Sequence, residues 1–442
     1  MRKYFSNEAV LENCKIFRML DAQAEKEHAS FHTPGHKRKG WDITELSYSD
    51  NLSSPKGCIL EAERDIAEIL GAYKSFILTD GSTCGVFSML FAAKTLGIKT
   101  VAFCESSHKS IYNGCLALGL APLPYPQKTR NKIPFAPTMS ALNEEFSAIL
   151  EKADALFLTS PDYYGNAADL RGAREYCNAH GKLLLVDGAH GGHLHFEKSL
   201  HASGFADMWV DGVHKSLPAF TQGAVVSASE RCAEALRGGV DVFRTTSPSY
   251  PIMASVEYAV KYPRNEALEK EVRAFVLENS RLYQNDDWTK LCATFGAAAF
   301  EVEKILESEG VFAEFCDGNV LTFYLSPATT MQEFVRLKAR LTELFARFPL
   351  GCALHEAVAK ETGKKEVDFV PAPVVFEKNA ATEWVELRAA VNRICAYNCG
   401  LFPPCTPLIS VGEQISAEKI ELLLKANNVF GLSEGKILVL KA

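Results

Sequence analysis

The sequence predicts an α/β fold in which a mostly parallel sheet is covered by helices on both faces and is followed by a smaller α+β C-terminal domain. Short apolar runs rich in β-branched residues alternate with longer segments of helical spacing. Polar residues follow most of these runs, as they do at the ligand-binding edge of open α/β sheets. We expect an N-terminal helical segment over residues 1–30, a large domain over 31–275 and the smaller domain over 276–442.

The expected elements follow one another along the 442 residues. Helical spacing covers 7–27, and a Pro-Gly pair marks the turn that follows. The large sheet is expected to contain apolar strands at residues 75–79, 100–104, 155–159, 182–186, 208–210 and 223–227. A charged helix over 264–280 leads out of the large domain. A strand over 318–325 and an amphipathic helix over 330–348 then begin the smaller domain.

Composition excludes several classes of function. A net charge of -7 argues against nucleic-acid binding, because contact with phosphates needs a basic face. We expect neither a signal peptide nor a membrane span, since no run approaches the roughly 20 apolar residues that cross a bilayer. The 13 cysteines form no Cys-x-x-Cys pair, which indicates thiols in a reducing compartment, the cytoplasm.

Two of the apolar runs lead into residues that suit pyridoxal 5'-phosphate (PLP). Asp187 directly follows the run at 182–186, and Lys215 follows the run at 208–210 within a His-Lys pair. PLP needs a lysine amine to hold its aldehyde as a Schiff base and a carboxylate to keep its ring nitrogen protonated. We therefore predict that Lys215 and Asp187 fill these roles.

A Gly-Ser-Thr segment offers a site for the phosphate. The segment follows the first strand and opens an apolar helix. Gly81 permits close approach of the phosphate to the backbone, while Ser82 and Thr83 donate hydrogen bonds at the positive end of the helix dipole. Taken alone, the segment could be an ordinary helix cap. Four segments that follow separate strands converge on one crevice, however, which favours the phosphate site.

Histidines near the same crevice allow two interpretations. His108 follows the second strand and could stack on the pyridine ring, while His190 lies close to the ring after Asp187. A zinc site is the alternative for the cluster His190, His193 and His195. No Cys pair or His-Glu-x-x-His helix accompanies it, so we predict no metal and interpret His193 and His195 as polar loop residues.

Taken together, these motifs resemble the ornithine/lysine/arginine decarboxylase family of fold-type-I PLP enzymes. The resemblance is carried by Phe-His-Thr-Pro-Gly-His-Lys at 31–37, Val-Asp-Gly-Ala-His-Gly at 186–191 and His-Lys-Ser-Leu-Pro-Ala at 214–219. Further matching stretches lie, in family order, at 81–83, 108–110, 160–165 and 245–251, and a weaker one at 402–413. The resemblance implies a three-layer large domain of the aspartate aminotransferase type.

It also implies roles for individual residues. Lys215 would form the Schiff base and Asp187 would pair with the ring nitrogen. His108 would stack on one face of the ring, with Ala189 on the other. His214 would lie beside the phosphate or the reacting carbon.

The implied reaction is decarboxylation of arginine, lysine or ornithine to the corresponding amine, as in polyamine biosynthesis, by a homodimer. Two alternatives stay open: another PLP reaction on this fold, transamination or a lyase reaction, and a PLP-binding protein without turnover.

Several positions depart from the family pattern. Gly212 stands in place of a serine, Val86 of an asparagine, Asp162 of a threonine and Gly188 of an acidic residue. The pairs at 105–106 and 405–406 depart as well. We expect Gly212→Ser to change PLP affinity only modestly, with a backbone N–H or water replacing the lost contact.

Which basic amino acid is used is not apparent from the sequence. Glu45 and Asp50 are candidates for binding a second substrate amine, and are equally well interpreted as solvated loop acids.

Overall fold

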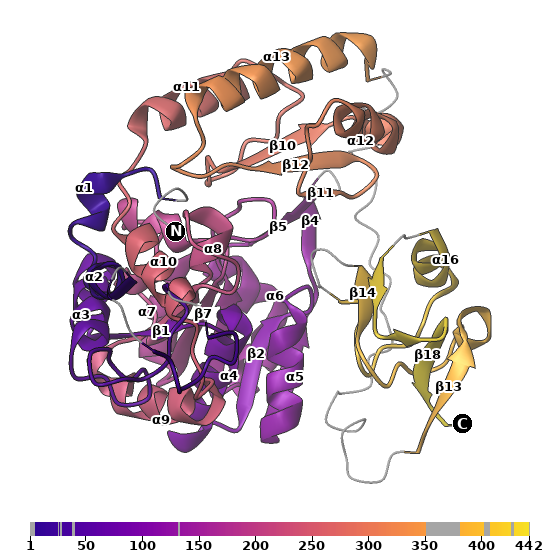
Figure 1. Cartoon of the computed structure of the whole chain (residues 1–442). Coiled ribbons are helices and arrows are strands. Elements are labelled where there is room, and N and C mark those ends of the chain that lie inside the picture. The colour runs from indigo at the N-terminus through magenta and orange to yellow at the C-terminus, as the bar shows by residue number, and fades with distance from the viewer. Residues whose placement is uncertain are drawn as a thin grey trace.

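A seven-stranded sheet is the centre of the computed structural model, which describes residues 5–24, 26, 29–37, 40–130, 133–350, 381–401, 407–425 and 428–441 (Figure 1). The strands lie in the order β1-β9-β8-β7-β6-β2-β3. Their bounds are β1 Lys74–Leu78, β2 Thr100–Cys104, β3 Ala121–Tyr125, β6 Ala155–Thr159, β7 Leu183–Gly188, β8 Met208–Asp211 and β9 Ala224–Ala228.

The sheet is mostly parallel, as the sequence predicts. The neighbouring pairs from β3 through β2, β6 and β7 to β8 are parallel. β9 alone among these strands runs the other way, antiparallel to both β8 and β1. Sequence reasoning missed β3, because Pro122 and Pro124 argue against a strand, yet an edge position tolerates them.

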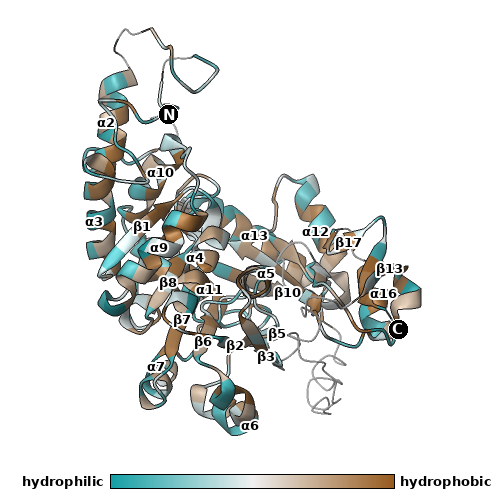
Figure 2. Ribbon diagram, turned by 90° about the horizontal axis from the view of Figure 1, so that it is seen from below, coloured by the Kyte–Doolittle hydropathy of each residue, from teal (hydrophilic) through white to brown (hydrophobic). Residues whose placement is uncertain are grey.

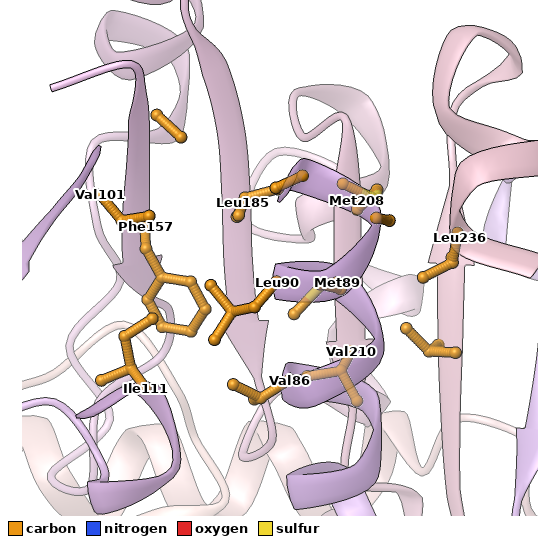
Figure 3. Packing of buried hydrophobic residues seen from close by; sticks show 14 of the residues in the cluster. Val86, Met89, Leu90, Val101, Ile111, Phe157, Leu185, Met208, Val210 and Leu236 are labelled. Carbon is orange, nitrogen blue, oxygen red and sulfur yellow. The ribbon is translucent and has the colours of Figure 1, made fainter. Parts of the chain in front are cut away.

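Helices cover both faces of the sheet. α4 (Gly81–Thr95), α5 (Lys109–Leu118) and α9 (Ala233–Phe243) bury one face, where alternate strand residues such as Phe157 and Leu185 meet Leu90 of α4 (Figure 3). The intervening strand residues face α6 (Met139–Lys152) and α7 (Leu170–Ala179). Near β1 and β9, the same layer is formed by α2 (Lys15–Ala24), α3 (Cys58–Leu70) and α10 (Tyr250–Val260). The strands are continuous apolar runs because both faces of the sheet are buried. Figure 2 shows hydrophobic residues along the central strands.

The N-terminal helix predicted over 7–27 is split into two. α1 covers Glu8–Leu11 and α2 covers Lys15–Ala24. The Glu257 carboxylate of α10 accepts hydrogen bonds from the backbone N–H groups of Lys15 and Ile16 at 2.6 and 2.8 Å. A contact from a distant helix thus caps α2 and sets the break.

A second body follows the large sheet along the chain. The predicted helices and strand are found there as α11 (Glu266–Leu277), β12 (Val320–Tyr324) and α13 (Met331–Arg347). β12 pairs antiparallel with β10 (Lys290–Thr294) and β11 (Phe315–Cys316), and α12 (Ala299–Ser308) packs beside them. These elements share a hydrophobic core of their own. The predicted boundary at residue 275 falls inside α11.

The C-terminal residues form a further body with a separate core (Figure 1). It contains α16 (Ala417–Lys425) and two small antiparallel sheets, whose bounds are β13 Thr382–Glu386, β14 Cys399–Leu401, β15 Pro407–Ile409, β16 Val429–Phe430, β17 Leu432–Ser433 and β18 Lys436–Leu440. Cys405 and Thr406 lie outside the described residues. No described helix is long and apolar enough to cross a membrane, and the cysteines of the described part are free thiols.

Candidate active site

A cavity of about 520 Å³ lies where the strand ends of the central sheet meet the two smaller bodies. Its wall includes every residue proposed from the sequence for the cofactor or the reaction: Gly81, Ser82, Thr83, His108, Asp187, Ala189, His190, His214 and Lys215. Phe315 of β11 and Leu408 of β15 contribute from the smaller bodies. The structure thus brings these side chains together, while their roles stay predictions.

The start of α4 forms one end of the cavity wall. Gly81 has φ +76°, a conformation that favours glycine, and begins a helix of 15 residues. Ser82 and Thr83 lie in its first turn. There the backbone N–H groups have no partner within the helix, and the positive end of the helix dipole is located. This end can therefore hold an anion such as a phosphate.

Asp187, the last residue but one of β7, is a buried carboxylate, 4% exposed. One oxygen accepts a hydrogen bond from the Ala189 N–H at 3.0 Å, and no other hydrogen bond to the carboxylate is formed within the described residues. Burial raises the pKa of Asp187, while the charge of Lys215 lowers it. A buried carboxylate at a cavity wall calls for a cationic partner.

Two hydroxyl groups in the wall also lack partners. Within the described chain, the side-chain oxygens of Ser107 and Thr159 are buried and form no hydrogen bond. Thr159 ends β6 directly beside Asp187 in the parallel register. Both residues were missed in the sequence, although the rule that polar residues at strand ends face the ligand applies to them. Together with Asp187 they fit a polar aromatic ring with a cationic nitrogen, as PLP has.

His108 and His214 flank Lys215 as neutral rings. His108 caps α5, its Nδ1 accepting the Ser110 N–H at 3.2 Å. Burial, with Lys215 and Lys109, lowers the pKa of His108 to about 3. His214 donates from Nδ1 to the Gly223 carbonyl at 3.0 Å, and burial lowers its pKa.

The three histidines of the alternative zinc site turn to different partners. His190 faces Lys215, its Nε2 lying 3.2 Å from Nζ. Nε2 of His193 forms a buried hydrogen bond with the Asp287 carboxylate at 2.8 Å, and Nδ1 of His195 donates to a backbone carbonyl. His193 and His195 are thus buried in a 3-10 helix, which corrects their interpretation as loop residues. No group of three metal-ligating side chains occurs in the described ranges.

Among the departures, Asp162 brings a half-buried acid to the cavity. Its carboxylate accepts the Tyr164 N–H at 2.9 Å and the Asn166 side-chain amide at 2.8 Å. Burial raises the pKa of Asp162 to about 6, against the lowering effect of these hydrogen bonds. The protein therefore carries an acid here that changes charge near neutral pH.

The raised pKa of Asp162 can be tested by comparing the free energy of unfolding of wild type with that of Asp162→Asn. An acid whose pKa is raised on folding stabilises the fold below its unfolded pKa, and this contribution is lost as pH rises through about 6. Asparagine does not titrate, so wild type should lose about 2 to 3 kcal/mol relative to the variant between pH 4 and 7. Denaturant unfolding of both proteins at the two pH values measures the change. An equal difference at both pH values would contradict the raised pKa.

Other departures have simple structural settings. Val86 packs in the core between α4 and the sheet, next to Val210 (Figure 3). A Cβ at position 188 would lie 3.0 Å from a carboxylate oxygen of Asp211, so that acid occupies the space beside Gly188. Glu105 accepts the Gln127 N–H at 3.1 Å.

Neither acid suggested for a second substrate amine lines the cavity. Asp50 accepts four backbone N–H groups in the loop before α3. Glu45 accepts the hydroxyl of its neighbour Thr44 at 2.6 Å.

Comparison with known proteins supplies the family. The profile of the family described as Orn/Lys/Arg decarboxylase, major domain, matches residues 39–290, more than half of the chain. An arginine decarboxylase of Bacillus subtilis is 26% identical over 93% of this chain and 93% of its own.

Solved structures agree with the fold. The constitutive lysine decarboxylase of E. coli superimposes with a TM-score of 0.72 at 19% identity, over 98% of this chain and 83% of that chain. A structure of SPT with the PLP internal aldimine gives a TM-score of 0.54 at 15% identity, over 77% of this chain and 85% of that chain. The profile match decides membership: the chain belongs to the Orn/Lys/Arg decarboxylase family, a family of amino acid decarboxylases.

Proposed function

We propose that this protein uses PLP to decarboxylate a basic amino acid, arginine, lysine or ornithine, to the corresponding amine. The observation that carries the proposal is one cavity wall with a lysine amine, Lys215, and a buried carboxylate, Asp187, that no described cation directly contacts. The unpartnered hydroxyls of Ser107 and Thr159 and the first turn of α4 complete a set of donors suited to PLP.

Bound PLP would supply an electron sink for the electrons released when the bond to the substrate carboxylate breaks. In that reaction Asp187 holds the proton on the ring nitrogen, because a buried negative charge favours a neighbouring cation. The first turn of α4 anchors the phosphate. Lys215, His214, His108 and Ala189 all line the cavity. Lys215 or His214 would return a proton to the substrate carbon, and His108 and Ala189 would confine the ring.

The acidic character of the cavity supports a basic substrate. Asp162 and Asp317 both line it, and neither forms an ion pair within the described residues. The Asp317 carboxylate accepts the Tyr164 hydroxyl at 2.9 Å, which holds it in the wall. Two such acids favour a substrate whose side chain carries a positive charge.

We further propose that the protein works in the cytoplasm, in polyamine biosynthesis, as a homodimer. The free thiols of the described cysteines support a reducing compartment. The Phe31 side chain is 94% exposed in the loop that matches the family motif, so a second copy could cover it.

The cofactor and substrate are tested together on the purified protein. We expect PLP to bind, and borohydride reduction followed by peptide mapping to place the label on Lys215. Lys290 is an internal control, because it is a buried lysine whose Nζ lies 3.5 Å from the His190 carbonyl. The loaded protein should release carbon dioxide and one amine from arginine, lysine or ornithine, and none from neutral glutamine.

Other outcomes would redirect the proposal. Label on Lys290, or no PLP after reconstitution, would remove Lys215 from its role. A keto acid or an aldehyde as product would favour the transaminase or lyase alternative, and a labelled Lys215 without any product would favour binding without turnover.

A further inference from the structure

A chain of hydrogen bonds runs from Lys215 into the second body. Lys215 Nζ lies 3.2 Å from Nε2 of His190, and the other ring nitrogen, Nδ1, lies 3.3 Å from the Tyr324 hydroxyl. The same hydroxyl lies 3.0 Å from the backbone carbonyl of Tyr163. Tyr324 belongs to β12 and is separated from His190 by 134 positions in the sequence.

The backbone carbonyl of Tyr163 at the end of these hydrogen bonds determines which atom donates and which accepts at each step. A backbone carbonyl can only accept, so the single Tyr324 proton is donated to Tyr163. The Tyr324 oxygen must then accept from His190, which places the imidazole proton on Nδ1. Nε2 is left with its lone pair toward Lys215, whose amine donates to it.

Burial keeps the imidazole neutral and the tyrosine in place. Burial, with the charges of Lys215 and Lys290, lowers the pKa of His190 well below its usual value, so the ring carries one proton. Burial also raises the pKa of Tyr324 well above its usual value, which preserves its hydroxyl proton. Lys290 is paired with Tyr324 across β10 and β12, and its Nζ lies 4.3 Å from the ring centre.

We propose that Tyr324 is a positioning residue that fixes His190 as the neutral Nδ1–H tautomer, so that Nε2 accepts a hydrogen bond from Nζ of Lys215. The amine that a Schiff base requires is thereby held in one orientation at the cavity wall, and no proton is transferred. The catalytic consequence rests on the proposed function, but the tautomer itself does not.

The tautomer is measured without cofactor or substrate. In ¹⁵N-histidine-labelled Lys215→Met, the amine that also favours the Nδ1–H form is removed, so Tyr324 alone decides. We expect a protonated Nδ1 and an unprotonated Nε2 for His190, with its signals assigned by their loss in Lys215→Met/His190→Gln. In Lys215→Met/Tyr324→Phe, the population should move by about tenfold toward Nε2–H, the ratio that one hydrogen bond sustains.

Tyr163→Phe in the Lys215→Met background is the matched control. It also removes a hydroxyl from the neighbouring ring, whose bond is to Glu314 at 2.9 Å, and it keeps the backbone carbonyl. The tautomer should be unchanged there. An Nε2–H form in Lys215→Met itself, no change with Tyr324→Phe, or an equal change with Tyr163→Phe would each overturn the proposal.

Kinetics then test the consequence in the loaded enzyme. With Lys215 restored, Tyr324→Phe should lower kcat by about tenfold and leave KM nearly unchanged, because the acceptor that orients the Lys215 amine is affected and not the substrate contacts. A raised KM with wild-type kcat would overturn the role assigned to Tyr324. Absence of turnover in wild type would refute the proposed function, and the spectra of Lys215→Met would still decide the tautomer.

Discussion

Asp187→Asn should lower turnover by about 100-fold or more while the fold and much of the PLP binding remain. Asparagine has the same shape and can still accept the Ala189 N–H, so the end of β7 keeps its geometry. What disappears is the buried charge that, in the proposed function, would hold a proton on the ring nitrogen. The proposed phosphate contacts at α4 and the proposed bond to Lys215 would not involve this carboxylate, so PLP should stay bound.

The measurement is the rate of carbon dioxide release at saturating PLP, with bound PLP followed by absorbance. Asp211→Asn is the matched control. Asp211 is buried on the adjacent strand, opposite Gly188 in the register, but it is not part of the cavity wall. Turnover there should stay within a few-fold of wild type. Near-normal turnover in Asp187→Asn would show that another group charges the ring nitrogen.

Gly212→Ser should weaken PLP binding by about tenfold or more and destabilise the protein by about 1 to 3 kcal/mol. A Cβ at this position would lie 2.4 Å from the carbonyl oxygen of Ala189, with the carbon atoms of the same residue at 3.1 and 3.2 Å. Backbone atoms cannot rotate away, so the chain on one of the two sides must shift. Gly212 directly precedes the helical turn of Lys215, Val213–Ser216, so the shift reaches the cavity.

The structure therefore predicts a larger effect of Gly212→Ser on PLP affinity than the modest one expected from the sequence alone. The sequence shows a missing hydroxyl, whereas the structure shows that the space of the side chain is filled by Ala189. Thermal unfolding and PLP titration measure the two effects. Gly238→Ser is the control, because no neighbour lies within 4 Å of a Cβ there. Wild-type affinity in Gly212→Ser would show that the Ala189 segment yields freely.

Local sequence signals predicted the sheet but not the contacts between distant segments. The runs at 100–104 and 155–159 coincide with β2 and β6 because strands buried on both faces are apolar throughout. The break between α1 and α2 depends on Glu257, and the burial of His193 depends on Asp287. Neither Glu257 nor Asp287 lies in the element that it contacts. Residue spacing along the sequence therefore could not predict these contacts.

In the candidate site, too, local sequence signals predicted some residues and missed others. Strand ends pointed to Asp187 and Lys215, and the same rule extends to Thr159. Tyr324 is different, because it reaches His190 from a strand of another body. The sequence around Tyr324 is that of any half-buried strand. Its contact with His190 therefore becomes apparent only from the way the two bodies pack together.

The hydrophobic cores carry a consequence for how the molecule assembles. The second body and the C-terminal body each have a core of their own residues, whereas the core beside α4 also includes Ala396 and Val411 from the C-terminal body. Domains generally fold as units, and the cavity wall draws Asp187, Phe315 and Leu408 from the three bodies. During refolding, we therefore expect the cavity to be completed only when the bodies associate, so that helical content returns before activity.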